Sequence, residues 1–232
     1  MGVCGFFTYP LALFLVLNCD SDLIIFLPIF MKLYYSAGAC SLSPHIVLKE
    51  SGLAFEAIAA PTKTHQLADG TDYYTINPLG YVPLLVLDDG TKLREGPAIV
   101  QYIADQVPAK KLAPLNGTFE RYKLQEWLTF IGTELHKGFS PLFTPGMPEE
   151  AKIIAKTRLI SRLQWVDSEL TKTPYLMGDT FTVADAYLFT VTGWAPHVGI
   201  DLSPLTHILT FRSLVSARPA VIDAMKAEGL IK

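Results

Sequence analysis

From Met31 onward, two kinds of hydrophobic pattern follow one another along the chain. Short apolar runs first alternate with helical repeats, and they predict strands over 32–35, 54–59, 84–87 and 91–94 with helices over 43–51 and 96–107. After a linker at 108–117 that is rich in Pro, Asn and Gly, only helical periodicity remains, over 118–138, 149–171 and 183–192. The pattern therefore predicts an α/β domain over 31–110 and an all-helical domain over 117–232.

Residues 1–30 have a different composition from the rest of the chain. They contain no Lys or Arg, and their apolar runs, 11–17 and 23–30, are separated by the polar segment 18–22. Neither run reaches the ~18 residues that a membrane span needs, and the basic start of a signal peptide is missing. We expect this segment to lie outside the fold. A membrane-associating leader is the alternative interpretation.

Charge and cysteine content narrow the classes of function. A net charge of −3 and a pI near 5.9 argue against a nucleic-acid partner. Neither a phosphate-binding glycine loop nor the paired cysteines of a zinc site occurs, so no metal is expected. Of three cysteines, Cys4 and Cys19 lie before residue 31 and only Cys40 lies after it, which suits a reducing cytoplasm.

Cys40 is the most informative residue because it stands next to a predicted helix start. Ser43 is a good N-cap, Pro44 is favoured in a first turn, and Gly52 is a good helix end, so a helix is predicted to start beside Cys40. Free N–H groups at such a helix start stabilise a thiolate, which predicts a pKa below the free value of about 8.5. The alternative is a small buried hydrophobic residue, the more common fate of a lone cysteine.

Two further features of the α/β domain suggest contacts to a small peptide. Val82-Pro83 opens an apolar strand, and a cis bond there would turn the backbone of Val82 outward to pair with an extended ligand. At Glu95-Gly96 a helix start offers N–H groups to a carboxylate and a side chain to an ammonium group. Each feature also has a plain structural explanation, an edge proline and a helix-start acid. Taken with the thiol, they describe a site for a small thiol peptide such as glutathione.

The chain from 31 to 232 resembles a bacterial glutathione S-transferase of the beta class. The segments that carry the resemblance occur in order along both predicted domains: 32–35, 40–45, 76–83, 95–99, 134–138, 181–187 and 194–197. The resemblance implies a glutathione transferase fold, in which an α/β thioredoxin-like N-terminal domain packs on an all-α C-terminal domain. It also implies a homodimer with active sites between the domains.

Site roles are implied by the same resemblance. It implies that Cys40 contacts the glutathione sulfur, that Val82 beside Pro83 pairs with the cysteinyl backbone, and that Glu95 and Gly96 hold the γ-glutamyl end. His136 is expected across the cleft as a second catalytic residue, and Trp194 is expected beside the electrophile, with a core position as its alternative. The remaining expected glutathione contacts are His65, where relatives often have lysine, Thr129, where they often have asparagine, and Thr133.

The implied reaction is attack of the glutathione thiolate on an apolar electrophile, as in detoxification. Because a free thiol is only a few per cent ionised at neutral pH, binding must lower its pKa. Cys40 adds a possible thiol–disulfide exchange or peroxidase activity. Since Ser43 stands where a second thiol would be, a second glutathione would have to resolve a mixed disulfide. A non-catalytic protein that sequesters apolar compounds is the other class, and stable membrane insertion is not expected.

Overall fold

The computed structural model describes residues 15–17, 23–25 and 30–232. Strands β1 (Leu15–Leu17) and β2 (Leu23–Ile25) pair only with each other, in a sheet separate from that of the main body. Most of 1–30, with Cys4 and Cys19, falls outside the described residues. That this segment stands apart from the fold therefore stays a prediction.

A mixed four-stranded sheet forms the first half of the main body. Its strands are β3 (Met31–Tyr35), β4 (Phe55–Ala59), β5 (Leu84–Leu87) and β6 (Lys92–Arg94), in the order β4-β3-β5-β6. β3 runs parallel to β4 with Leu33 opposite Ala57, whereas β5 is antiparallel to both β3 and β6. Leu33 is buried and Lys32 is exposed, as the alternation of a sheet requires.

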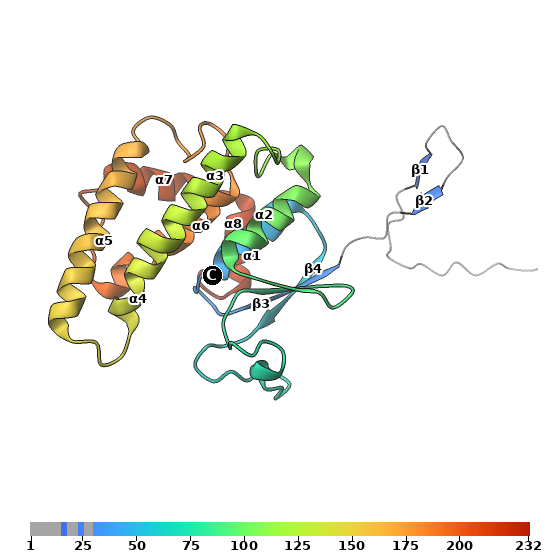
Figure 1. The fold of residues 1–232 in the computed structure, drawn as a ribbon, viewed down its shortest axis with the longest axis horizontal. Coiled ribbons are helices and arrows are strands. Elements are labelled where there is room, and N and C mark those ends of the chain that lie inside the picture. Colours follow the sequence, from blue (N-terminus) through green and yellow to red (C-terminus); the bar gives the residue numbers. More distant parts are fainter. Residues whose placement is uncertain (1–14, 18–22, 26–29) are drawn as a thin grey trace, which may run out of the picture.

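Two helices, α1 (Leu42–Ser51) and α2 (Gly96–Gln106), cover one face of this sheet (Figure 1). α1 is buried along most of its length, because the sheet lies on one side of it and the helical domain on the other. The helix ends at Gly52 in the left-handed conformation, as predicted. Its start differs from the prediction, since the N-cap position falls at Ser41 and Ser43 lies inside the first turn.

The second half is helical from Phe119 to Ala227 (Figure 1). Its helices are α3 (Phe119–Phe130), the π-helical stretch η3 (Ile131–His136), α4 (Lys137–Phe143), α5 (Glu149–Glu169), α6 (Val183–Thr192), α7 (Thr206–Ser216) and α8 (Pro219–Ala227). Short 3₁₀ turns occur at η1 (Tyr73–Thr75), η2 (Pro108–Lys110) and η4 (Ala195–Val198). The sequence pattern predicts the helices up to 192 and does not resolve α7 and α8.

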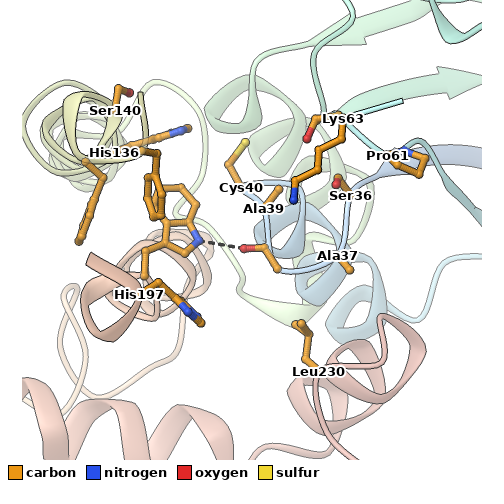
Figure 2. A pocket seen from close by; sticks show the side chains of 15 residues that line it. Ser36, Ala37, Ala39, Cys40, Pro61, Lys63, His136, Ser140, His197 and Leu230 are labelled. Atoms are coloured by element: carbon orange, nitrogen blue, oxygen red, sulfur yellow. Dashed lines mark hydrogen bonds between the residues drawn. The ribbon is translucent and has the colours of Figure 1, made fainter. Parts of the chain in front are cut away.

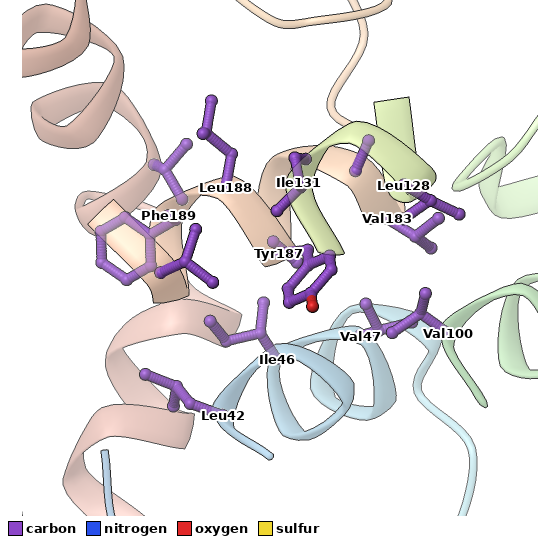
Figure 3. Packing of buried hydrophobic residues seen from close by; sticks show 14 of the residues in the cluster. Leu42, Ile46, Val47, Val100, Leu128, Ile131, Val183, Tyr187, Leu188 and Phe189 are labelled. Atoms are coloured by element: carbon purple, nitrogen blue, oxygen red, sulfur yellow. The ribbon is translucent and has the colours of Figure 1, made fainter. Parts of the chain in front are cut away.

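A continuous hydrophobic core joins the two halves. Ile46 and Val47 of α1 and Val100 of α2 pack with residues of α3 and α6, and Tyr187 of α6 lies among them (Figure 3). α6 is buried at every position, so it forms the centre of the helical domain. The C-terminal helix α8 packs back against α1 and brings the chain end to the domain junction. Residues from both ends of the chain can thus contribute to one site.

Candidate active site

A cavity of about 820 Å³ opens where the two domains meet. One wall is the loop from Ser36 to Cys40 that links β3 to α1, with residues 61–63 beside it. The opposite wall comes from the helical domain: His136, Phe139, Ser140, Phe143, Trp194 and His197. Leu230, near the C-terminal end, lies on the side of the loop (Figure 2). The structure therefore brings three of the predicted site residues, Cys40, His136 and Trp194, to one pocket.

Two groups of the helical domain hold the loop at Gly38. The indole Nε1–H of Trp194 donates to the Gly38 carbonyl at 2.8 Å (Figure 2), and the Gly38 N–H donates to a carboxyl oxygen of Glu228 at 2.9 Å. Gly38 has a φ of +70°, and a Cβ there would lie 3.4 Å from Leu230. This position therefore favours glycine, and both polar groups of its backbone bind across the domain junction.

Behind the loop, Glu228 is held by a buried histidine. The second oxygen of the Glu228 carboxyl lies 2.8 Å from Nδ1 of His45, and both side chains are fully shielded from solvent. His45 comes from α1 and Glu228 directly follows α8, so this contact ties the C-terminal end of the chain to the N-terminal domain. Sequence reasoning missed this contact, since no local pattern links residues so far apart.

The Cys40 thiol donates to the Val82 carbonyl at 3.2 Å. Part of its surface remains open to the cavity. Burial raises the pKa of the thiol to about 11, although the N–H groups of Cys40 and Ser41 act in the opposite direction. Glu95 raises this pKa further, and Lys137 lowers it. The expectation of a lowered Cys40 pKa is therefore wrong, because desolvation outweighs the donors of the helix start.

Val82 and Pro83 are buried beside Cys40, and the peptide bond between them is cis. The Val82 carbonyl is occupied by the Cys40 thiol, whereas its N–H has no acceptor among the described residues. The sequence predicts that both groups are free for a ligand. In the structure only the N–H is available without displacing an existing contact.

Glu95 occupies the N-cap position of α2 with a φ of +67°. A side chain in this left-handed region costs about 1–3 kcal/mol and occurs where the surroundings enforce it. Glu95 is exposed, and the first turn of α2 starts at Gly96. A Cβ added at Gly96 would lie 3.9 Å from Cγ of Pro83, so this helix start is close to the cis peptide bond. Glu95 is close enough to act on the pKa of the Cys40 thiol, and the role of Glu95 and Gly96 toward a ligand stays a prediction.

His136 ends the π-helical stretch η3 and faces the cavity. Its Nδ1 lies 2.6 Å from the hydroxyl of Tyr187. Burial and the neighbouring Lys137 lower the pKa of His136 to about 4, so the imidazole is neutral at neutral pH. π-Helical segments are frequent at functional sites. Tyr187 is not among the predicted site residues, because an apolar helix position carries no sign of its contact to His136.

Aromatic rings line the helical side of the cavity. Trp194 contacts the rings of His136, Phe139 and Phe143 at centroid distances of 5.0, 5.6 and 6.2 Å, with interplanar angles of 67°, 86° and 86°. Phe143 is about half exposed, so this wall offers apolar surface to a ligand. Trp194 serves both as a wall of the cavity and as the partner of Gly38.

Of the predicted glutathione contacts, only Cys40 lines this cavity. The others lie outside its lining: His65, Val82, Pro83, Glu95, Gly96, Thr129 and Thr133. Thr129 and Thr133 are exposed on α3 and η3, where the Thr133 hydroxyl donates to the Thr129 carbonyl. His65 stacks on Tyr74 at 4.5 Å, and its Nδ1 is buried with no partner among the described residues. Lys63, two residues earlier, does line the cavity (Figure 2). A cation is thus available to a carboxylate there, from a residue other than His65.

Metal-ligand clusters and membrane-spanning helices are both absent from the described part of the chain. No group of three or more His, Cys, Asp or Glu side chains there could hold a metal ion. None of the helices described is both long and apolar enough to cross a membrane.

Comparison with protein families gives two matches in the order of the two domains. Residues 37–106 match the glutathione S-transferase N-terminal domain, and residues 130–219 match the glutathione S-transferase C-terminal domain. Glutathione S-transferase GstA of Escherichia coli O157:H7 is 50% identical over 201 residues, which are 86% of this chain and all of that protein. Glutathione S-transferase GST-4.5 of Xanthomonas campestris is 40% identical over 207 residues, which are 86% of this chain and all of that protein.

Solved structures agree with this result. The ternary complex of BphK, a bacterial glutathione S-transferase, aligns with a TM-score of 0.84 and 56% identity over 85% of this chain and 99% of its own. The bacterial beta-class glutathione S-transferase of Sphingomonas chungbukensis aligns with a TM-score of 0.83 and 48% identity, over 86% of this chain and 100% of its own. A sphingomonad glutathione S-transferase complexed with glutathione aligns with a TM-score of 0.83 and 45% identity, over 86% of this chain and 100% of its own.

Proposed function

Because this chain belongs to the glutathione S-transferase family and is a transferase of the bacterial beta-class type, we propose that glutathione binds with its sulfur between Cys40 and His136. The observation that carries the proposal is the shared cavity, where these two residues approach from different domains. The neutral His136 can donate to a sulfur anion, and so can the Cys40 thiol once it turns away from the Val82 carbonyl. Two donors directed at the thiolate lower the pKa of the bound thiol.

The rest of the glutathione molecule lies along the N-terminal domain. The free N–H of Val82 pairs with the cysteinyl carbonyl, beside Pro83. The γ-glutamyl carboxylate accepts from the first turn of α2 at Gly96, and the ammonium group donates to Glu95. Lys63 binds the glycyl carboxylate, which leaves His65 as a support of the loop.

The electrophile occupies the aromatic side of the cavity. Trp194 and Phe143 supply apolar surface within the same pocket as Cys40, so a bound thiolate and an apolar compound would be neighbours. Thr129 and Thr133 lie outside this cavity, and they stay candidates for ligand contacts from the exposed face of α3 and η3.

The high pKa of Cys40 favours conjugation over redox chemistry as the main reaction. In thiol–disulfide exchange, the Cys40 thiolate would attack oxidised glutathione, form a mixed disulfide and release one reduced glutathione. At neutral pH little of the required thiolate is present. Conjugation needs only the thiolate of glutathione itself. It therefore proceeds without ionisation of Cys40.

We also propose that the protein is a cytoplasmic homodimer with a role in detoxification. A glutathione-dependent enzyme needs the reduced peptide, which a reducing compartment supplies. Exposed apolar side chains on α3 and α5, namely Tyr122, Ile153, Ile154 and Trp165, give a second copy a surface to cover. Light scattering coupled to size-exclusion chromatography tests the dimer by its mass in solution. A mass of one chain would contradict it.

Calorimetric titration of reduced glutathione tests the site directly. A Kd between micromolar and millimolar, about −8 to −4 kcal/mol, supports the proposal. Lys63→Gln should weaken binding about tenfold, and Lys110→Gln, an exposed lysine of η2, serves as the matched control. Absence of binding in the wild-type protein, or equal affinity in Lys63→Gln, would contradict the arrangement.

A further inference from the structure

Tyr187 contributes a polar group at the edge of the core. Its ring packs among apolar side chains of α1, α2 and α6, and only 4% of the residue is exposed (Figure 3). Its hydroxyl lies 2.6 Å from Nδ1 of His136 and has no other partner among the described residues. A Cβ on Gly132, in the π-helical stretch η3, would come within 3.7 Å of this hydroxyl. The small Gly132 and the hydroxyl thus fit together beneath His136.

The chemistry of the two groups decides which of them donates. A phenol is a stronger acid than the N–H of a neutral imidazole, and an imidazole nitrogen is a stronger base than a phenol oxygen. The favoured hydrogen bond is therefore O–H to Nδ1. In the reverse arrangement the phenol hydrogen would be left without an acceptor in the described structure, which is costly for a buried group.

We propose that Tyr187 is a positioning residue that fixes His136 as the Nε2–H tautomer and directs this N–H toward the glutathione sulfur. This inference rests on the proposed function, since it assigns a partner to the donor of His136. When glutathione binds, its thiol proton leaves to water, and the Nε2–H of His136 donates to the sulfur anion that remains. Tyr187 then acts on the reaction through His136 and touches no substrate atom.

The charges around the pair are compatible with this role. Lys137 is the neighbouring charged group that acts on His136, and it opposes a second proton on the ring. Cys40 and Glu95 are the titratable groups that act on Tyr187, and both of them oppose ionisation of the phenol. Burial also favours the neutral form of each group, because it lowers the pKa of His136 and raises the pKa of Tyr187. Both members of the pair are therefore neutral at neutral pH, as a phenol-to-imidazole hydrogen bond requires.

The tautomer can be measured without any substitution at Tyr187. Nitrogen-15 NMR of the histidine-labelled full chain separates Nδ1–H from Nε2–H rings, and His136→Gln identifies the signals of His136. The expected result is the Nε2–H tautomer from pH 6 to 8, with or without glutathione. An Nδ1–H ring, or a cationic one, overturns the proposal. Because this readout needs no ligand, it stays informative even if glutathione fails to bind.

Kinetics test the consequence. Tyr187→Phe removes the hydroxyl and keeps the ring, and kcat with glutathione and an aryl halide should fall about fivefold, the effect of one lost hydrogen bond. With glutathione saturating, the pKa in the pH profile of kcat/KM for the aryl halide should rise by about half a unit, because the bound sulfur anion loses an oriented donor. The matched control is Tyr175→Phe, which loses a buried hydroxyl that contacts Arg218 in the same domain.

A double substitution distinguishes positioning from a general effect on packing. In a His136→Ala background, Tyr187→Phe should change kcat less than twofold, because the group that it positions is gone. A full fivefold loss in that background, or a Tyr187→Phe enzyme with unchanged kcat and pH profile, would refute the role. Glutathione titration of each variant shows whether the glutathione site itself is intact.

Discussion

At Cys40, burial and a helix start act on the same thiol in opposite directions. The sequence shows the helix start, and so it predicts a lowered pKa. The structure adds the desolvation of a thiol enclosed between the Val82 carbonyl and the domain junction, and that contribution is larger. A thiol that stays protonated donates a hydrogen bond, whereas a thiolate would repel a second sulfur anion. The high pKa therefore suits a residue beside a bound glutathione thiolate.

The reactivity of Cys40 should depend on this pKa. We expect alkylation of Cys40 by iodoacetamide to be slow at pH 7 and to increase about tenfold per pH unit up to about pH 10, since the thiolate is the reacting form. Intact mass after timed quenching gives the rate, and Cys40→Ala identifies labelling of Cys4 and Cys19. A plateau below pH 8 would show a lowered pKa and contradict the structure. The same Ala variant should keep conjugation within a few fold.

At the scale of elements, local patterns predict those parts of the fold that local chemistry determines. The strands, α1, α2, the end of α1 at Gly52 and the capping box before α6 all depend on neighbouring residues. The same patterns predict ordinary helix where the π-helical stretch η3 lies, because its backbone change leaves the apolar periodicity nearly intact. They miss α7 and α8, whose apolar positions face a core assembled from distant segments.

The site was predictable to the same extent. Cys40, Val82-Pro83 and Glu95-Gly96 stand at element starts that the sequence marks, and His136 and Trp194 came from the family resemblance. Tyr187, Glu228 and His45 act through contacts between segments far apart in the chain, which no local pattern encodes. The position of Lys63 rather than His65 at the cavity depends on how the loop after β4 folds back, and that is likewise a tertiary effect.

The capping box at α6 should stabilise the whole helical domain. The Asp185 carboxylate accepts from the N–H of Thr182 at 2.7 Å and from the N–H of Leu176 at 2.8 Å. We expect Asp185→Ala to lower the free energy of unfolding by about 2–3 kcal/mol, since it removes a cap and leaves buried N–H groups without partners. Urea unfolding measures this. Asp179→Ala, an exposed acid in the preceding loop, is the control and should change stability by less than about 0.5 kcal/mol.

α6 also carries Tyr187 and is followed directly by Trp194, which lines the cavity. The position of the helix start therefore affects how these two side chains are placed. A loss of stability in Asp185→Ala no greater than in Asp179→Ala would show that packing alone fixes this helix. In that case the buried position of every α6 residue, rather than the cap, would determine how it presents Tyr187.

At the scale of the whole molecule, the segment before Met31 should be dispensable for folding. All four strands of the main sheet and every helix in the described residues begin at or after Met31. Among the described residues, the hydrogen bond that links this segment to the main body is an exposed one, from the Phe30 N–H to Asp88. We expect the Tm of a chain that spans 31–232 to stay within about 2 °C of the full chain, by scanning calorimetry. A fall of ~10 °C or more would assign the segment a structural role.

The junction between the domains depends on Glu228, and this links stability to ligand binding. Its carboxyl bridges His45 of α1 and the N–H of Gly38, while Trp194 holds the Gly38 carbonyl from the other side. Glu228→Gln keeps the size of the side chain, yet its NH₂ cannot accept as the second oxygen does. One of two buried contacts is lost, which should lower the free energy of unfolding by about 1–3 kcal/mol.

The loop that Glu228 holds also forms one wall of the cavity, so the same variant should bind glutathione more weakly, by about three- to tenfold in Kd by calorimetry. Glu56→Gln, whose half-exposed carboxylate pairs with Lys32, is the control and should leave both quantities nearly unchanged. If Glu228→Gln loses stability with no change in Kd, the loop is fixed by its own contacts, such as that of Ser41 with Ser36. If both change together, the C-terminal end of the chain shapes a site formed from the first residues of the fold.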